Sequence, residues 1–239
     1  MSIEVTPSPS LVAILNEAYP KCPKHHSVCR EHKVEWREKG GHVARGFTGA
    51  GGAISEVQLV LILAEPGNPG DGESYNGREA NLVRQIATGV ANAIRNWEET
   101  GSIFHRNLAI ILNECWPGLS LEEQLRRTWI TESILCSAPV SSGPINKAVG
   151  QACGELFLER QLALFPNAFV VCLGRKAEQR LSYIGLEANE WAAAPGKPGG
   201  LTKKAQRSWV RVGRLFRRHL ASVRRRKESN ESGRSPRVD

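Results

Sequence analysis

The sequence predicts a doubly wound α/β fold, a three-layer α/β/α sandwich around a mostly parallel, four-stranded sheet. Short runs such as Gln58–Ala64 and Ala168–Leu173 are almost continuously apolar, as expected for strands that are covered on both faces. Segments with apolar residues at every third or fourth position alternate with these runs. Strands that alternate with helices in this way are typical of a parallel sheet between two helical layers.

The first half of the chain is expected to begin with a short helix, Leu11–Ala18, and a ligand-rich loop, Lys21–His32. The glycine-rich segment Lys39–Ala53 follows as a connection or a small hairpin. After the first buried strand, apolar residues at spacings of three to four predict a helix over residues 77–99. The apolar run Asn107–Leu112 is predicted to be the second strand.

Capping residues mark the helices of the second half. Ser120 and Glu123 form a capping box for a helix over Leu121–Arg127. Pro144 suits the first turn of a helix that runs to about Phe165. Gly174 opens a short helix, and Thr202 can cap the final one. The strands expected between these helices are Trp129–Leu135, Ala168–Leu173 and Trp191–Ala194.

The length of 239 residues suits one compact domain with additions at its ends. We expect an N-terminal extension with a cysteine-rich loop over residues 1–53, the α/β domain over 54–221, and a basic, disordered tail over 222–239. The hydrophobic fraction of 41% is enough to bury a core. No apolar run approaches the ~18 residues of a membrane span. We therefore expect a cytoplasmic monomer that does not associate with membranes.

Positive charge gathers near the C-terminus. Between Lys203 and Lys227 there are eleven Lys and Arg residues and no Asp or Glu, and the formal net charge of the chain is +8. Such a cationic face is typical of a protein that binds phosphate backbones, and DNA is the expected partner. The alternative is a solvated helix with a soluble tail. The candidate DNA-binding residues are Lys203, Lys204, Arg207, Arg211 and Arg214.

The loop after the first strand carries the candidate chemistry. Glu65 leaves the end of that strand, where a carboxylate can orient water or stabilise positive charge. Pro66 and Gly67 follow it, glycines allow a ligand to approach the backbone closely, and Tyr75 offers a ring for stacking. The alternative is a tight turn with a surface glutamate.

Four cysteines form two pairs, a near pair around residues 22–29 and a distant pair around residues 136–153. In a reducing compartment thiolate ligands are more common than disulfides, and four thiolates suit either an iron–sulfur cluster or zinc. The candidate ligands are Cys22, Cys29, Cys136 and Cys153, with His25 and His26 as further zinc ligands. The alternative is that Cys153 packs within its helix and the near pair is free. Cys115 and Cys172 are interpreted as core or loop thiols.

Several blocks follow one another in the order of a known superfamily. They are the loop at Glu65, ITESILCSAP, PINKAVGQACGELFLERQLALFPNAFVVCLGRKAEQRL and WAAAPG. Together they resemble the uracil-DNA glycosylases, most of all their iron–sulfur-bearing bacterial branch, over about Gln58–Leu220. The segment Phe165–Ala177 is the counterpart of the family's P-x-x-[apolar]-LG-x-x-A block. The resemblance implies an α/β/α sandwich that acts on a flipped-out base.

The chain departs from that family at three positions. The iron–sulfur branch has its acid at the position where this chain has Ala64. Another branch places the acid directly before the proline, which is the position of Glu65. Glu132 stands where the family reads the base with asparagine; a carboxylate would repel O4 of uracil and accept more naturally from an amino group. Ala194 and Pro195 stand where the family has His-Pro. Loss of such a donor typically costs ~3–4 kcal/mol in the transition state.

The resemblance implies a DNA glycosylase that excises a damaged or deaminated base, with a [4Fe–4S] cluster on the four cysteines. Glu65 would orient water or stabilise the sugar, Tyr75 would stack on the base and Glu132 would read its edge. Two alternatives remain, a catalytically inactive nucleic-acid-binding member of the same fold and a hydrolase of another nucleotide-like substrate. Glu132 and Asp71 are the next candidate acids, whereas His105 and His219 are interpreted as surface or packing residues.

Overall fold

The computed structural model describes residues 2–19, 21–70, 73–75, 81–140, 143–196 and 199–232, without the side chains of His26 and of residues 227–232. Its sheet has the strand order β1-β3-β2-β4-β5. The last four strands in the chain are parallel, and β1 pairs antiparallel with β3. The α/β prediction is confirmed, but the sheet has five strands instead of four. The strands are β1 (Thr48–Gly49), β2 (Leu59–Leu63), β3 (Thr128–Glu132), β4 (Phe169–Leu173) and β5 (Glu190–Ala192).

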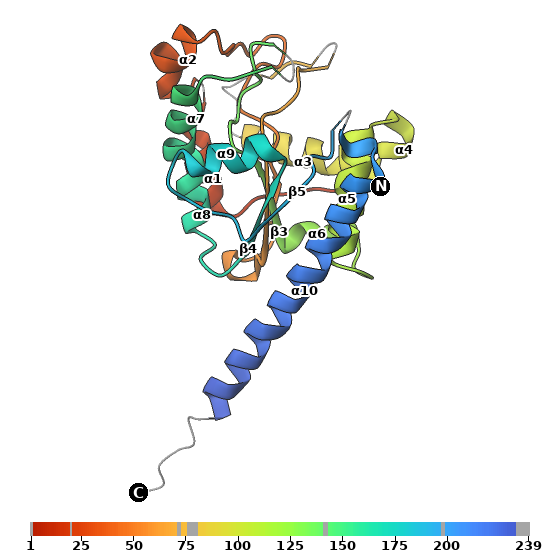
Figure 1. The fold of residues 1–239 in the computed structure, drawn as a ribbon. Helices are drawn as coiled ribbons and strands as arrows, with labels where there is room; N and C mark the ends of the chain where they lie inside the picture. The colour runs from red at the N-terminus through yellow and green to blue at the C-terminus, as the bar shows by residue number, and fades with distance from the viewer. Residues whose placement is uncertain are drawn as a thin grey trace, which may run out of the picture.

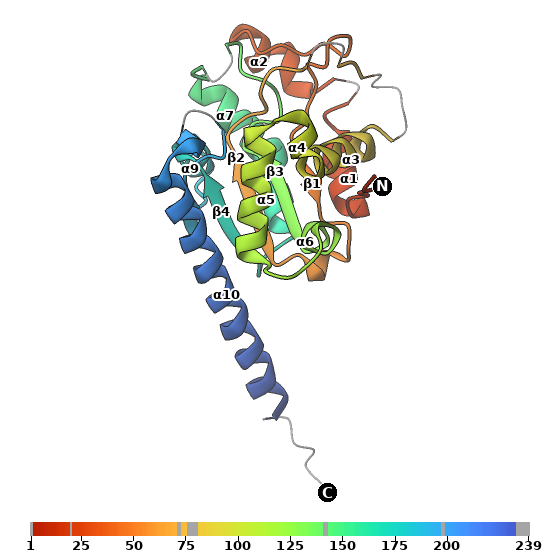
Figure 2. The same ribbon diagram turned by 90° about the vertical axis from the view of Figure 1, so that its right-hand side faces the viewer.

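Helices cover both faces of the sheet (Figure 1, Figure 2). On one side lie α3 (Leu82–Arg95), α5 (Ile103–Cys115) and α10 (Lys203–Ser232). On the other side lie α7 (Lys147–Cys153), α8 (Glu159–Ala163) and α9 (Arg175–Ser182), with a π-helical turn, Gly154–Leu158, between the first two. The shorter elements are α1 (Pro9–Asn16), α2 (Val28–Glu31), α4 (Trp97–Thr100), α6 (Leu121–Arg126) and the 3₁₀ turns Pro23–His26, Ile54–Glu56 and Gly199–Leu201.

The register of the parallel strands brings their carboxyl ends to one edge of the sheet. Leu63, the last residue of β2, stands beside Glu132, the last residue of β3. Every residue of these two strands is buried, because helices lie on both faces. Loops that follow β2, β3, β4 and β5 therefore meet at this edge, as expected for a ligand site of an open parallel sheet.

One predicted strand is wrong. The run Asn107–Leu112 lies inside helix α5, which begins after the N-cap Ser102. Leu108, Ile111 and Leu112 are fully buried at helical spacing, so the apolar run is the inner face of a helix. A short apolar run does not by itself separate a buried strand from a buried helix.

The predicted caps are confirmed, with one change. Ser120 and Glu123 make the capping box of α6, and the Thr202 hydroxyl accepts from the backbone N–H of Ala205 at the start of α10. The helix expected from Pro144 begins instead at Lys147. Its N-cap is Asn146, whose side chain accepts from the Ala148 N–H.

The two ends of the chain are more structured than expected. The backbone of Ile3 exchanges two hydrogen bonds with the Asn92 side chain on α3, and Leu11 and Leu15 on α1 are fully buried. At the other end, α10 continues past residue 221 to Ser232 and projects away from the sheet (Figure 1, Figure 2). None of the helices that the structure describes is long and apolar enough to cross a membrane.

Candidate active-site cleft, thiol cavity and basic helix

A cleft of about 920 Å³ opens where the parallel strands end. Its wall on one side comes from apolar residues of α3 and α5, among them Ile86, Val90 and Leu108. Its other side comes from the loops that follow β2 and β5. All seven predicted catalytic and substrate-binding residues line this one cleft, although they are far apart in the sequence: Glu65, Pro66, Gly67, Tyr75, Glu132, Ala194 and Pro195.

The loop after β2 is held from two directions. The Gly67 carbonyl accepts hydrogen bonds from Arg45 and from the Ser137 hydroxyl, the latter at 2.9 Å. The Tyr75 hydroxyl donates to Glu73 at 2.9 Å, and burial together with that carboxylate raises the pKa of Tyr75 to about 12. Tyr75 therefore stays a neutral hydrogen-bond donor at the cleft. Asp71, Gly72 and Gly77 of the predicted loop fall among the residues that the structure does not describe.

Glu65 is buried in a network of cations and is not the surface residue of a tight turn. Its side chain is 7% exposed, and it pairs with Arg180, whose side chain is 6% exposed. The Lys176 ammonium lies 3.1 Å from Glu65 Oε1. Arg180 also donates to the Ala64 carbonyl at 2.6 Å, which joins helix α9 to the end of β2. The carboxylate is thereby oriented, and much of its negative charge is balanced.

Glu132 occupies the end of β3 and is only 3% exposed. Among the described residues, its Oε2 atom has no hydrogen-bond partner. Gly46 allows this placement, because a Cβ there would lie 2.6 Å from Glu132 Cγ, and its φ of +87° favours glycine. Burial, and then the charge of Glu65, raise the pKa of Glu132 well above its usual range, although Arg180 and Arg45 oppose the shift.

The turn after β5 is fixed by its neighbours. Trp209 Nε1 donates to the Ala193 carbonyl at 2.8 Å, and the Asn107 amide on α5 donates to the Pro195 carbonyl at 2.7 Å. Gly174 leaves room for Ala194, since a Cβ on Gly174 would stand 3.1 Å from that of Ala194. The turn is rigid, and Ala194 carries no group that could donate a hydrogen bond.

His105, interpreted from the sequence as a surface or packing residue, lines the cleft from the first turn of α5, and its Nδ1 lies 2.7 Å from the Ser102 hydroxyl. Burial lowers the pKa of His105, so the ring is neutral near pH 7. Its place in the cleft was not predicted, because the run beyond it was interpreted as a strand. His219, by contrast, packs against the ring of Phe169, as a packing residue would.

Four thiols meet at a second site, on the other side of the sheet from α10. A small cavity of about 20 Å³ is lined by all four predicted ligands, Cys22, Cys29, Cys136 and Cys153. Its other walls are mostly apolar, among them Val34, Ile134 and Val149, and Lys24 and His25 also line it. Burial raises the pKa of Cys29 to about 11 and that of Cys153 to about 12, so the thiols are protonated at neutral pH in the absence of a metal.

Within the described part of the chain, no group of three or more His, Cys, Asp or Glu residues is close enough to hold one metal ion. Cys115 and Cys172 are buried elsewhere, in α5 and β4, as expected of core thiols.

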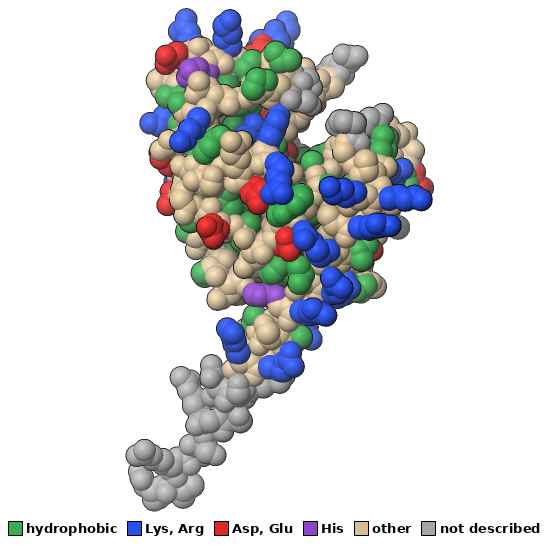
Figure 3. All heavy atoms as spheres, viewed as in Figure 1, with side chains coloured by type: hydrophobic (Ala, Val, Ile, Leu, Met, Phe, Trp, Pro, Cys, Tyr) green, Lys and Arg blue, Asp and Glu red, His purple; other side chains and the backbone are tan. Residues whose placement is uncertain are grey.

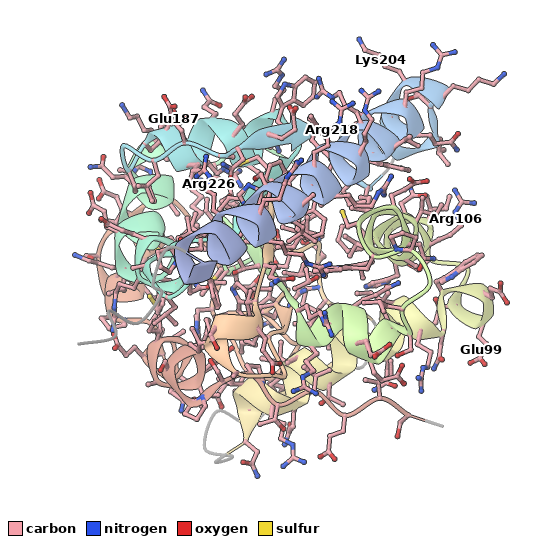
Figure 4. The ribbon with its side chains drawn as sticks, turned by 90° about the horizontal axis from the view of Figure 1, so that it is seen from below. Glu99, Arg106, Glu187, Lys204, Arg218 and Arg226 are labelled. Atoms are coloured by element: carbon pink, nitrogen blue, oxygen red, sulfur yellow. The ribbon has the colours of Figure 1, made fainter. Side chains whose placement is uncertain are left out.

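Helix α10 carries exposed cations along its length (Figure 3). We call Lys203, Lys204 and Arg207 the proximal basic group, because they follow Gly199, a residue of the cleft. We call Arg214 and Arg218 the distal basic group. Figure 4 shows Lys204, Arg218 and Arg226 following one another along the helix. Arg211, also predicted to bind DNA, pairs with Glu190 at 3.0 Å and donates to the Trp191 carbonyl.

Comparisons with known proteins identify no family. No family model and no curated protein matches the chain.

Proposed function

We propose that the protein is a DNA glycosylase-like hydrolase, which flips a damaged or deaminated base out of DNA and excises it by attack of water on the N-glycosidic bond. One observation carries the proposal. The seven candidate catalytic and substrate-binding residues come from three separate segments, the loop after β2, the end of β3 and the turn after β5, and all of them line one cleft at the carboxyl ends of the parallel strands. Chemistry on a base requires such a pocket, because the reacting atoms are inaccessible inside a duplex.

In this proposal the base enters beside Tyr75, which offers a neutral ring for stacking, and its edge meets Glu132. Glu65 acts where the sugar becomes positively charged. Because Arg180 and Lys176 pair with Glu65 and hold its carboxylate in place, Glu65 serves to orient water and the sugar. The proximal basic group, which follows the cleft residue Gly199 in the chain, contacts phosphates.

We propose further that Cys22, Cys29, Cys136 and Cys153 hold a [4Fe–4S] cluster, with zinc as the alternative. When bound, the group supplies a covalent link between the N-terminal segment and the chain that follows β3. Cys136 comes shortly after Glu132, so that link would fix the floor of the cleft.

Base release from a panel of oligonucleotides tests the activity. Each carries one uracil, hypoxanthine, xanthine or alkylated base, in single- and double-stranded form. We expect release of at least one of these bases, leaving an abasic site, and a loss of release in the Glu65→Gln variant. Failure of the purified, cluster-loaded protein to release any base would reject the proposal.

The second candidate is a catalytically inactive member of the same fold that binds nucleic acid. Ala194 carries no donor for the departing base, and Glu65 is tied into ion pairs, which favours this reading. Tight binding of the same oligonucleotides without release would support it. A hydrolase of another nucleotide-like substrate is the third candidate, and release of bases from free nucleosides would identify it.

A further inference from the structure

The buried carboxyl of Glu132 has an unusual setting for a charged group. It is 3% exposed at the floor of the cleft, and Oε2 lacks a partner among the described residues. An ionised carboxylate that is removed from water needs hydrogen bonds or a cation of its own. A neutral carboxylic acid does not, and it retains one donor and one acceptor for a ligand.

The cations near Glu132 are committed to other groups. Arg180 bonds to Glu65 and to the Ala64 carbonyl, and Lys176 bonds to Glu65 and to the Gly143 carbonyl. Arg45 donates to the Gly67 carbonyl and to Ser137. The negative charge of Glu65 lies close enough to Glu132 to disfavour a second charge. The two carboxyl groups thus differ in setting, because Glu65 pairs with two cations whereas Glu132 has no cation of its own, which favours the neutral form of Glu132.

We propose that Glu132, as a neutral carboxylic acid, recognises a base edge that presents one hydrogen-bond donor beside one acceptor. This inference rests on the proposed function and specifies the substrate class of that cleft. The acid O–H donates to the acceptor of the base, while its carbonyl accepts from the neighbouring N–H. Uracil and hypoxanthine present such an edge as a cyclic amide, and cytosine presents one as an amidine. An ionised Glu132 could only accept, and the sequence led us to expect that it accepts from an amino group.

Gly46 is part of this arrangement. Its absent side chain leaves the space into which the Glu132 carboxyl fits, with Oε1 only 2.8 Å from where a Cβ would stand. The neighbouring strand β2 fixes the other side through the pairing of Leu63 with Glu132. The acid is therefore held in one orientation, as bidentate recognition requires.

The protonation state is tested without any substrate. An infrared difference spectrum between the wild type and Glu132→Gln at pH 7 should contain the carbonyl stretch of a protonated carboxylic acid. A difference that contains only carboxylate bands would overturn the inference, yet it would leave the glycosylase proposal untouched, because base release is measured separately.

Binding of free bases tests the edge. 1-Methyluracil and 1-methylcytosine are the two probes, because N1 is blocked in them as it is by the sugar in DNA, and 1,3-dimethyluracil, which lacks the N3–H, is the control for 1-methyluracil. We expect 1,3-dimethyluracil to bind roughly five- to a hundredfold more weakly than 1-methyluracil, the scale of one bidentate contact. Equal binding of 1-methyluracil and 1,3-dimethyluracil, or binding of neither, would reject the inference. The relative affinity of 1-methyluracil and 1-methylcytosine shows which of the two edges the site prefers.

Two variants separate recognition from a structural role. Glu132→Gln retains a donor and an acceptor, so it should bind 1-methyluracil, whereas Glu132→Leu should not. Wild-type affinity should fall about tenfold per pH unit above the pH at which Glu132 ionises, and Glu132→Gln should show only the ionisation of the base itself. An identical alkaline fall in both proteins would contradict the inference. The charged and titratable groups around this site are Arg45, Glu65, Glu73, Tyr75, His105, Lys176 and Arg180.

Discussion

Replacing Glu65 by glutamine should cost stability as well as activity. The side chains of Glu65 and Arg180 are 7% and 6% exposed, so the substitution leaves a buried guanidinium without its counter-ion. Removing one partner of a buried ion pair costs ~3–5 kcal/mol. Arg180 retains the Ala64 carbonyl at 2.6 Å, and glutamine can still accept one hydrogen bond, so we expect the lower end, about 3 kcal/mol. The pair with Lys176, whose side chain is 43% exposed, adds little.

Urea unfolding measures this loss. With a slope of about 3 kcal/mol per molar, 3 kcal/mol moves the unfolding midpoint down by roughly 1 M. Base release should fall by at least about a hundredfold under conditions in which the variant is folded. Lys176→Met is the matched control, since it leaves the buried pair intact and should shift the midpoint far less. An unchanged midpoint for Glu65→Gln would refute the reasoning that this ion pair is buried and structural.

Three further predictions follow from the other features. Cys136→Ala should remove the colour and the roughly four irons per chain of an anaerobically purified protein, whereas Cys115→Ala should keep both; a colourless wild type with no bound metal would contradict the cluster. Replacing the three residues of the proximal basic group by glutamate should weaken DNA binding and flatten the plot of log affinity against log salt concentration by roughly 0.9 per lost phosphate contact. The same replacement in the distal basic group should have a smaller effect. An equal or larger effect of the distal group would show that DNA does not cross the cleft. Because the pKa of Glu132 is raised on folding, its contribution to stability is fully present below about pH 4.5 and is lost as the pH rises toward the folded pKa. The melting temperature of Glu132→Gln should therefore decline less steeply than that of the wild type over that range. Parallel declines of the two melting temperatures would show that Glu132 is not the group responsible.

Much of the parallel core was predictable because its signal is local. Strands such as Leu59–Leu63 and Phe169–Leu173 are apolar on both faces, and that pattern survives in the sequence alone. The edge strand β1 was missed, since two residues carry no periodicity and their pairing with β3 is decided by tertiary contacts. Helix α5 was interpreted as a strand because the tested run was shorter than two helical turns.

The candidate site, like the fold, was predictable from the sequence only in part. The position of Glu65 after a buried strand predicts that it faces the cleft, and the two cysteine pairs predict a shared cavity. The ion pairs of Glu65 were not predictable, because Arg180 and Lys176 come from a helix more than a hundred residues away in the chain. The raised pKa of Glu132 was also hidden, since it depends on burial and on the charge of Glu65, not on any neighbouring residue in the sequence.

Loading of the proposed cluster would depend on the protonation of the buried thiols. Each cysteine must lose a proton before it can ligate, and burial holds the pKa of all four thiols above the usual value. Loading would therefore release protons into solution and proceed faster in alkaline buffer. The same burial keeps the empty site in its thiol form, which reacts slowly with oxidants, because the thiolate is the nucleophile. A metal-free chain would thus remain competent for reconstitution.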